Sequence, residues 1–259
     1  MDKRIAFITG GANGIGLCTT EHLIKEGYQV FVLDTDEKAL NSMIDKFYPD
    51  VQGYHGSVSC EEDVIAAFEQ LKSTWGRLDL LFNNAGSTGP VKLTHDINND
   101  EFMDTLAVTL GGMHNCTRQA IPMMKAQQSG NIVNMTSTAY GFGYPYRSPY
   151  TAAKWGVVGL TKTWAMELGR DNITVNAVSP GCVDNDRLNM LIQIDADKKG
   201  LSFEETVKIW KATVSMRTFV DSEEVAALVA YYGSPAAKRI SGQVIAIDGH
   251  TEGLGDQSI

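Results

Sequence analysis

Tyr150 and Lys154 are the two residues of this chain whose types and spacing most directly indicate chemistry. They stand four residues apart at the start of a stretch that reads as a helix, 151–168, so their side chains share one helix face. A tyrosine phenol has a reference pKa of about 10, and lowering it to about 7 requires about 4 kcal/mol of preferential stabilisation of the phenolate. A nearby ammonium supplies stabilisation of that sign. The pair could therefore move a proton at a substrate oxygen, although spacing alone fits an interface tyrosine and a surface lysine more often.

Seven short runs of β-branched or aromatic residues alternate with helical stretches along the whole chain, and these elements would position the pair. Several runs are apolar almost throughout, as expected for strands that helices cover on both faces of a parallel sheet. The pattern predicts an α/β fold, a doubly wound, seven-stranded parallel sheet of the Rossmann-like type. The predicted strands are residues 5–9, 29–34, 52–58, 78–83, 131–136, 174–179 and 243–248.

The domain organisation follows from the absence of repeats, linkers and composition shifts, so we expect one catalytic domain over residues 1–259. Segment 181–219 departs from the alternation of one strand with one helix, because it follows a strand but carries two helical stretches, 187–199 and 203–214. An excursion of this kind beyond the strand ends usually covers a site.

A glycine-rich turn lies between the first predicted strand and an apolar-periodic helix. Glycines there permit a tight turn and close backbone approach, so a pyrophosphate can sit against the helix N-terminus. A plain strand-to-helix loop has a similar composition, but the strand before and the helix after favour a dinucleotide site. The residues concerned are Gly10, Asn13, Gly14, Ile15 and Gly16.

Asp34 ends the second predicted strand, about 20 residues after the glycine turn, where a carboxylate can accept hydrogen bonds from the adenosine ribose. The same charge would repel a 2′-phosphate, and neither Asn13 nor Thr35 offers the cation that NADP requires. The sequence therefore predicts NAD as the cofactor. A helix cap at Asp34 is the alternative interpretation.

The overall composition limits the partners. A net charge of −9 without any run of Lys or Arg disfavours nucleic acid. The four cysteines lie far apart, which suggests neither a metal site nor a disulfide framework. No stretch has the pattern of a signal peptide or a membrane span, so we expect a cytoplasmic protein with a small-molecule partner.

Taken in order, the motifs resemble those of the single-domain short-chain dehydrogenases/reductases over nearly the whole chain. Residues 9–16 read like T-G-x-x-x-G-x-G, residues 83–86 match N-N-A-G, and residues 150–154 match Y-x-x-x-K, with Ser137 ahead of them. Pro180 and Gly181 follow the sixth predicted strand. Each piece alone is common, but together and in order they are specific.

The resemblance implies an oxidoreductase that transfers a hydride between NAD(H) and a secondary alcohol or ketone, in which Tyr150 is the acid/base. Lys154 would support it and reach the nicotinamide ribose, and Ser137 would donate a hydrogen bond to the substrate oxygen. A homotetramer or homodimer is also implied, assembled through the long helices expected over 102–127 and 150–170. The implied cofactor contacts are Gly10, Asn13, Gly14, Ile15, Gly16, Asp34, Ser57, Val58, Asn84, Ala85, Gly86, Tyr150, Lys154, Pro180, Gly181, Val183 and Asn185.

The chain departs from the family pattern at three polar positions. Thr109 stands at the fourth catalytic position, where the family usually carries an Asn that holds a water linked to the lysine. Ser57 replaces an Asp that commonly contacts adenine, and Asn185 replaces a Thr near the nicotinamide. A hydroxyl retains donor and acceptor capacity, so we expect Thr109 to keep the proton relay working.

The substrate and the activity itself leave alternatives open. The aromatic segment 140–147 could stack on an apolar substrate or pack against 188–214 or a second subunit, and Arg147 could meet an acidic group or be a surface charge. A catalytically weak NAD-sensing regulator is the main alternative function. A sugar-nucleotide epimerase or dehydratase would normally need a longer C-terminal domain.

Overall fold

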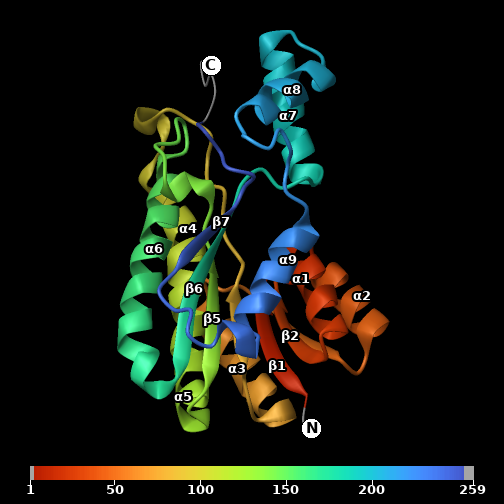
Figure 1. Ribbon diagram of the computed structural model, residues 1–259, viewed down its shortest axis with the longest axis vertical. Coiled ribbons are helices and arrows are strands. Elements are labelled where there is room, and N and C mark those ends of the chain that lie inside the picture. The colour runs from red at the N-terminus through yellow and green to blue at the C-terminus, as the bar shows by residue number, and fades with distance from the viewer. Residues whose placement is uncertain (1–2, 254–259) are drawn as a thin grey trace.

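A seven-stranded parallel sheet organises the computed structural model of the chain, which describes residues 3–253 (Figure 1). The strand order is β3-β2-β1-β4-β5-β6-β7, so the direction of winding reverses between β1 and β4. Ligands of doubly wound folds bind outside the carboxyl ends of the strands at such a reversal. The strands are β1 Arg4–Thr9, β2 Tyr28–Asp34, β3 Val51–His55, β4 Leu80–Asn83, β5 Gly130–Met135, β6 Ile173–Pro180 and β7 Val244–Ile247.

Helices cover both faces of this sheet. Side chains of α1, α2 and α9 pack on one face, and side chains of α3, α5 and α6 pack on the other. The helices are α1 Gly14–Lys25, α2 Glu37–Phe47, α3 Glu61–Trp75, α4 Asn99–Leu106, α5 Gly112–Gln127, α6 Ser148–Leu168, α7 Asp186–Lys199, α8 Phe203–Ala212 and α9 Ser222–Tyr232. Within residues 3–253, none of them combines the length and apolarity that a membrane span requires.

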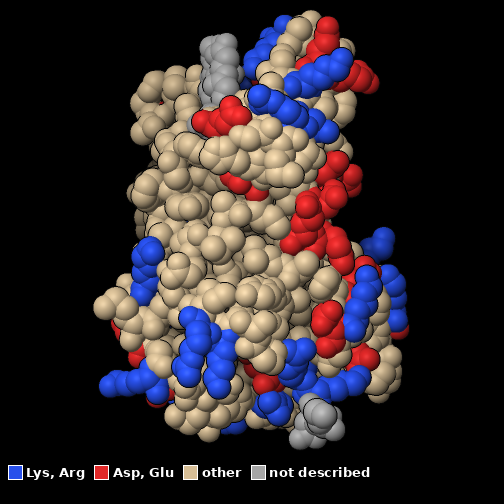
Figure 2. All heavy atoms as spheres, viewed as in Figure 1, with Lys and Arg blue, Asp and Glu red and all other residues tan. Residues whose placement is uncertain are grey.

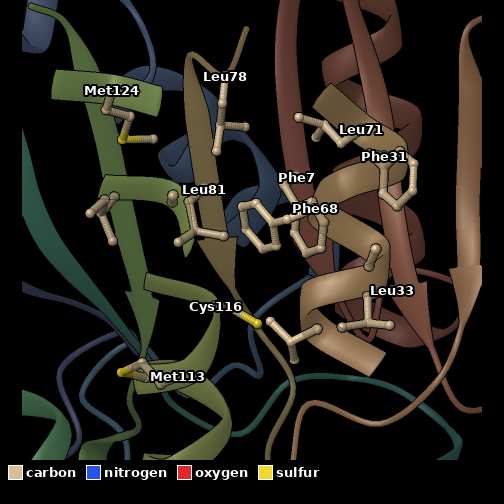
Figure 3. Close-up of a cluster of buried hydrophobic side chains, with 14 of the residues drawn as sticks. Phe7, Phe31, Leu33, Phe68, Leu71, Leu78, Leu81, Met113, Cys116 and Met124 are labelled. Carbon is tan, nitrogen blue, oxygen red and sulfur yellow. The ribbon is translucent and has the colours of Figure 1, made fainter. Parts of the chain in front are cut away.

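The core explains why the strands are apolar almost throughout. Figure 3 shows one cluster, in which Phe7 of β1 stacks between Phe31 of β2 and Phe68 of α3. The Phe7 ring centroid lies 4.3 Å from that of Phe68 and 5.4 Å from that of Phe31. Because the opposite face of the same strands buries a second cluster that includes Ile8 and Val32, consecutive residues are all buried. The predicted doubly wound fold is confirmed.

Three local features differ from the sequence prediction. Strand β3 ends at His55 rather than at residue 58, because the Gly56 N–H makes the last bond to β2, at the Asp34 carbonyl, and the Ser57 N–H then donates to the Asp63 side chain instead. Helix α6 begins at Ser148, with Pro149 in its first turn, where a missing N–H costs no hydrogen bond. The helical stretch predicted over 102–127 is interrupted by a π-helical turn, Ala107–Gly111.

Segment 181–219 leaves the sheet and returns. Helices α7 and α8 lie beyond the carboxyl ends of the strands, at the top of Figure 1. They form a small apolar cluster of their own, with Leu188, Ile192 and Phe219 buried and Trp210 packed against them. The excursion is therefore a compact unit placed over the strand ends.

Candidate functional site

An open cleft of about 1080 Å³ lies between the strand ends and the α7–α8 unit. Two residues predicted for the site, Gly16 and Thr109, do not line it. All the others do, namely Gly10, Asn13, Gly14, Ile15, Asp34, Ser57, Val58, Asn84, Ala85, Gly86, Ser137, Tyr150, Lys154, Pro180, Gly181, Val183 and Asn185. The cleft therefore gathers residues from both ends of the sequence, as the motifs predicted.

Lys154 is held in the wall of this cleft with only 4% of its surface exposed. Its Nζ donates to the carbonyl of Met135 at 3.0 Å and lies 5.6 Å from the centroid of the Tyr150 ring. Burial, together with the smaller effect of the Arg187 charge, lowers the pKa of Lys154 to about 8. At neutral pH the ammonium is therefore still the dominant form, next to the phenol.

Tyr150 and Ser137 face the cleft from two neighbouring elements. Tyr150 lies in the first turn of α6, and the Thr136 hydroxyl ties that helix to the end of β5 by donating to the Lys154 carbonyl at 2.9 Å. Ser137 follows β5 directly, and its Oγ accepts the N–H of Ala139 at 3.3 Å. Because Oγ is used there as an acceptor, its hydrogen remains available to a substrate oxygen.

Thr109 is fully buried behind Gly86. Its Oγ1 accepts the N–H of Ser87 at 3.2 Å. A methyl group built on Gly86 would lie 3.5 Å from Lys154 Nζ and 3.6 Å from Thr109 Oγ1, so the two atoms are no more than about 7 Å apart. The π-helical turn, a feature that often occurs at functional sites, gives Thr109 this position.

Because one or two waters can bridge such a separation, we expect Thr109→Asn to change kcat by less than about threefold, since the amide replaces one donor and acceptor group by another. Thr109→Val is the matched control, because it keeps the shape and removes the hydroxyl. We expect it to lower kcat by about tenfold, since the Ser87 N–H also loses its acceptor. Steady-state kinetics beside thermal unfolding measure both effects. A large gain in Thr109→Asn would show that the natural relay is impaired.

The glycine turn has the geometry that a pyrophosphate cradle requires. Gly10 and Gly14 adopt positive φ values of 61° and 52°, which other residues rarely adopt, and no atom lies within 4 Å of the position of a Cβ at Gly14. Gly16 acts differently, because its Cβ would lie 1.9 Å from the Gly10 carbonyl oxygen. Gly16 therefore permits α1 to pack against the turn, and the turn itself faces the cleft.

Asn84 fixes the turn from the neighbouring strand. Its Nδ2 donates to the carbonyls of Thr9 and Gly10 at 3.0 and 2.9 Å. The Thr9 hydroxyl in turn accepts the N–H groups of Asn84 and Ala85. The side chain of Asn84 thus joins the end of β4 to the glycine turn, and the residue also lines the cleft.

Asp34 is buried where β2 ends, beside the glycine turn. Its two carboxylate oxygens accept the N–H groups of Ala12 and Asp36, both at 2.9 Å. These bonds fix the carboxylate against the cleft, and each oxygen keeps a lone pair for a ribose hydroxyl. The basic residues that line the cleft lie on other segments, namely Arg147, Lys154, Arg187, Lys198 and Lys199.

The remaining predicted contacts have structural partners as well. The Ser57 N–H donates to Asp63 at 2.8 Å and its hydroxyl lies 2.9 Å from that of Ser59. Asn185 caps α7 by accepting the N–H of Leu188 at 3.0 Å. Val183 is buried in the core and also lines the cleft.

Sequence reasoning missed several residues of the cleft. Met135 supplies the carbonyl that holds Lys154, and Cys182 and Arg187 also line the walls, whereas Tyr144, which lines them too, belongs to the predicted aromatic segment 140–147. The sequence contained one indication for Arg187, because this residue directly follows Asn185, a predicted cofactor contact, and Asp186 near the start of the excursion. The direction in which its side chain points depends on how α7 returns over the strand ends, which the sequence does not show.

With this geometry in place, comparison with known proteins identifies the family. The family model described as "Enoyl-(Acyl carrier protein) reductase" matches residues 10–250. The chain is 32% identical over 252 residues to the 3-oxoacyl-[acyl-carrier-protein] reductase FabG of Thermotoga maritima, covering 96% of this chain and 98% of that one. The chain belongs to the short-chain dehydrogenase/reductase family, whose members are oxidoreductases that bind a nicotinamide cofactor.

Two solved structures are similar over almost their full length. Actinorhodin polyketide ketoreductase with NADPH has a TM-score of 0.91 at 32% identity, covering 97% of this chain and 98% of that one. Xylitol dehydrogenase with NAD⁺ has a TM-score of 0.88 at 28% identity, covering 94% and 97%. These relatives differ in cofactor and in substrate, so neither property follows from the family alone.

Proposed function

We propose that this protein transfers a hydride between NAD(H) and a secondary alcohol or ketone, with Tyr150 as the acid/base. The observation that carries the proposal is the buried Lys154 ammonium, held by the Met135 carbonyl with its Nζ 5.6 Å from the Tyr150 ring centroid. Burying a cation costs free energy, so a buried ammonium is uncommon without a functional reason. Here the ammonium lies beside a phenol in an open cleft, which is the arrangement expected of a catalytic pair.

Each residue then has one task. Ser137 donates a hydrogen bond to the substrate oxygen and holds it near the Tyr150 hydroxyl. Tyr150 takes the proton in alcohol oxidation and returns it in ketone reduction, while Lys154 stabilises the phenolate. Thr109 continues the path of the proton from Lys154 past Gly86. The bound cofactor supplies the hydride acceptor or donor.

The cofactor is the second part of the proposal. The glycine turn with its positive φ angles fits a pyrophosphate, and the Asp34 carboxylate fits an adenosine ribose with free hydroxyls. An NADP 2′-phosphate would meet that carboxylate, with no Arg or Lys of the cleft lining between residues 10 and 58 to neutralise it. We therefore propose NAD rather than NADP.

The test is a substrate panel for the purified protein with NAD⁺, NADH, NADP⁺ and NADPH. Sterols, polyols, hydroxy acids and cyclic ketones are assayed by nicotinamide absorbance, and NAD affinity is measured separately by calorimetry. Turnover of at least one class with NAD supports the proposal. Tight NAD binding without turnover of any substrate class would favour the NAD-sensing alternative. The argument for that alternative is that Thr109 stands where the family usually carries a catalytic Asn.

We also propose a homotetramer or homodimer assembled through α4, α5 and α6 in a cytoplasmic protein. Apolar side chains are exposed on these helices, namely Met103, Trp155 and Met166, of which Met166 is 86% exposed. Met166→Glu is expected to shift the protein to a smaller species in analytical ultracentrifugation. Met190→Glu, on the exposed side of α7, is the matched control and should leave the mass unchanged.

A further inference from the structure

Two arginines approach the catalytic tyrosine from different elements. Arg147 precedes α6, and its guanidinium carbon lies 5.7 Å from the centroid of the Tyr150 ring and 5.8 Å from that of Tyr144. Arg187 lies in the first turn of α7, close enough for its charge to act on both Tyr150 and Lys154. Both arginines line the cleft. Three cationic side chains therefore surround one phenol.

Neither arginine has an acidic partner among residues 3–253. Two arginines elsewhere in the chain do have one, since Arg77 pairs with Asp79 and Arg118 with Glu61, each at 2.6 Å. The side chains of Arg147 and Arg187 form neither an ion pair nor a hydrogen bond within residues 3–253, and both line the cleft with Tyr150. In a chain with a net charge of −9, the positive charge at this part of the cleft is therefore not compensated by an acidic side chain.

The acidic residues of the cleft are engaged elsewhere or lie outside reach of a pair. Asp34 lies at the adenosine end and holds two backbone N–H groups. Asp195 accepts the Trp210 Nε1–H at 2.8 Å and pairs with Lys199 at 3.1 Å. Asp186 precedes Arg187 in the helix but forms no ion pair with it. No acidic side chain of the cleft therefore neutralises the two arginines.

The electrostatic effect of this crowding is visible in the charged groups themselves. Burial lowers the pKa of Arg187, and the charge of Arg147 lowers it further. Arg187 in turn contributes to the lowered pKa of Lys154. An anion placed among them would favour the charged form of all three.

The geometry points to a substrate that carries an oxyanion, a carboxylate or a phosphate, which binds Arg147 and Arg187 next to the oxygen that reacts at Tyr150. This assignment rests on the proposed oxidoreductase function and names its substrate class: a hydroxy acid, a keto acid or a phosphorylated alcohol. Guanidinium groups suit this task, because their planar N–H forks match the geometry of carboxylates and phosphates.

The surroundings limit the rest of the substrate. The α7–α8 unit lines the cleft with apolar side chains, including Leu191, Ile194 and Ile209, so these side chains can cover an apolar chain of the substrate beyond the reacting carbon. Lys198 and Lys199 also line the cleft along α7, and Lys199 is paired with Asp195. Figure 2 shows Lys and Arg side chains, beside acidic ones, over α7 and α8. The α7–α8 unit carries charges of both signs, so the assignment of an anion depends on Arg147 and Arg187 and not on the overall charge of this unit.

Matched substrate pairs test this assignment in the full-length protein with NAD⁺. 3-Hydroxybutyrate is compared with its methyl ester, and glycerol 3-phosphate with glycerol, so that the two pairs also distinguish a carboxylate from a phosphate. The variants are Arg147→Gln and Arg187→Met, with Arg239→Gln as a control at an exposed arginine outside the cleft. Each cleft variant should lower kcat/KM for the anionic member about 10- to 100-fold and change the neutral member by less than about threefold.

A binding measurement keeps the result independent of turnover. Butyrate, inorganic phosphate and butyramide are titrated calorimetrically into the protein saturated with NADH. The assignment is supported if an anion binds more tightly than butyramide and if this binding is weakened in both cleft variants but not in Arg239→Gln. A failure of every tested compound to react would count against the proposed oxidoreductase function alone, and not against the anion site. Equal binding of butyramide overturns the assignment. So does a loss of NADH affinity without a loss of anion affinity, because the arginines would then serve the cofactor phosphates.

Discussion

Tyr150→Phe is expected to lower kcat/KM for any alcohol or ketone that the wild-type protein turns over by about 10²- to 10⁴-fold, the usual contribution of general acid–base catalysis. The substitution removes only the hydroxyl, so the ring remains beside the Lys154 ammonium and the Arg147 guanidinium. NAD affinity should stay within about threefold, because the glycine turn and Asp34 are untouched. The measurements are steady-state kinetics by nicotinamide absorbance and calorimetric titration of NAD.

The control for this result is Phe142→Leu, a change in the neighbouring aromatic segment outside the cleft lining. It should leave kcat/KM within about threefold. Retention of more than a tenth of wild-type activity in Tyr150→Phe would assign the proton transfer to another group.

The pH dependence follows from the Lys154 ammonium. Burial lowers its pKa to about 8, so its charge is present below that pH and is lost as the pH rises through it. Stabilisation of the Tyr150 phenolate by Lys154 should therefore weaken above about pH 8. In Lys154→Met this alkaline change should disappear together with most of the activity, which a pH series of kcat/KM for both proteins would show.

The sequence was sufficient for the parts of the molecule that depend on local pattern. Strands buried on both faces are apolar almost throughout, as Phe7 and Ile8 on opposite faces of β1 illustrate, so their number and approximate positions along the chain were predictable. The glycine turn was predictable because only glycine accepts the backbone conformation of Gly10 and Gly14 readily.

Features that depend on tertiary packing were not predictable. The π-helical turn that places Thr109 behind Gly86 replaces a regular helix and has no local sequence signal. The end of β3 at His55 depends on the Ser57 N–H, which donates to the Asp63 side chain of α3 and not to β2, a choice that only the folded structure shows. Arg187 lines the cleft, and its charge acts on Lys154, because α7 lies over the strand ends, a position that no local sequence pattern predicts.

Cofactor choice gives the second large effect, and Asp34 is the residue that should control it. We expect the wild-type protein to prefer NAD⁺ over NADP⁺ in kcat/KM by at least about 100-fold, because the 2′-phosphate would lie against a fixed carboxylate. The double variant Asp34→Asn with Thr35→Arg removes that charge and supplies a cation, since Thr35 also lines the cleft. It should shift the ratio toward NADP⁺ by about 100-fold or more.

The choice of asparagine follows from the contacts of the carboxylate. Asp34 accepts the Ala12 and Asp36 N–H groups, and an amide can still accept one of them, whereas alanine would leave both without a partner. Asp36→Asn is the matched control, because this neighbouring carboxylate lies outside the cleft lining and holds Asn13 and the start of α2. It should change the cofactor ratio by less than about threefold, and thermal unfolding separates cofactor effects from folding effects. A wild-type protein that uses both cofactors equally would show that Asp34 does not select against the 2′-phosphate, and would contradict the proposed preference for NAD⁺.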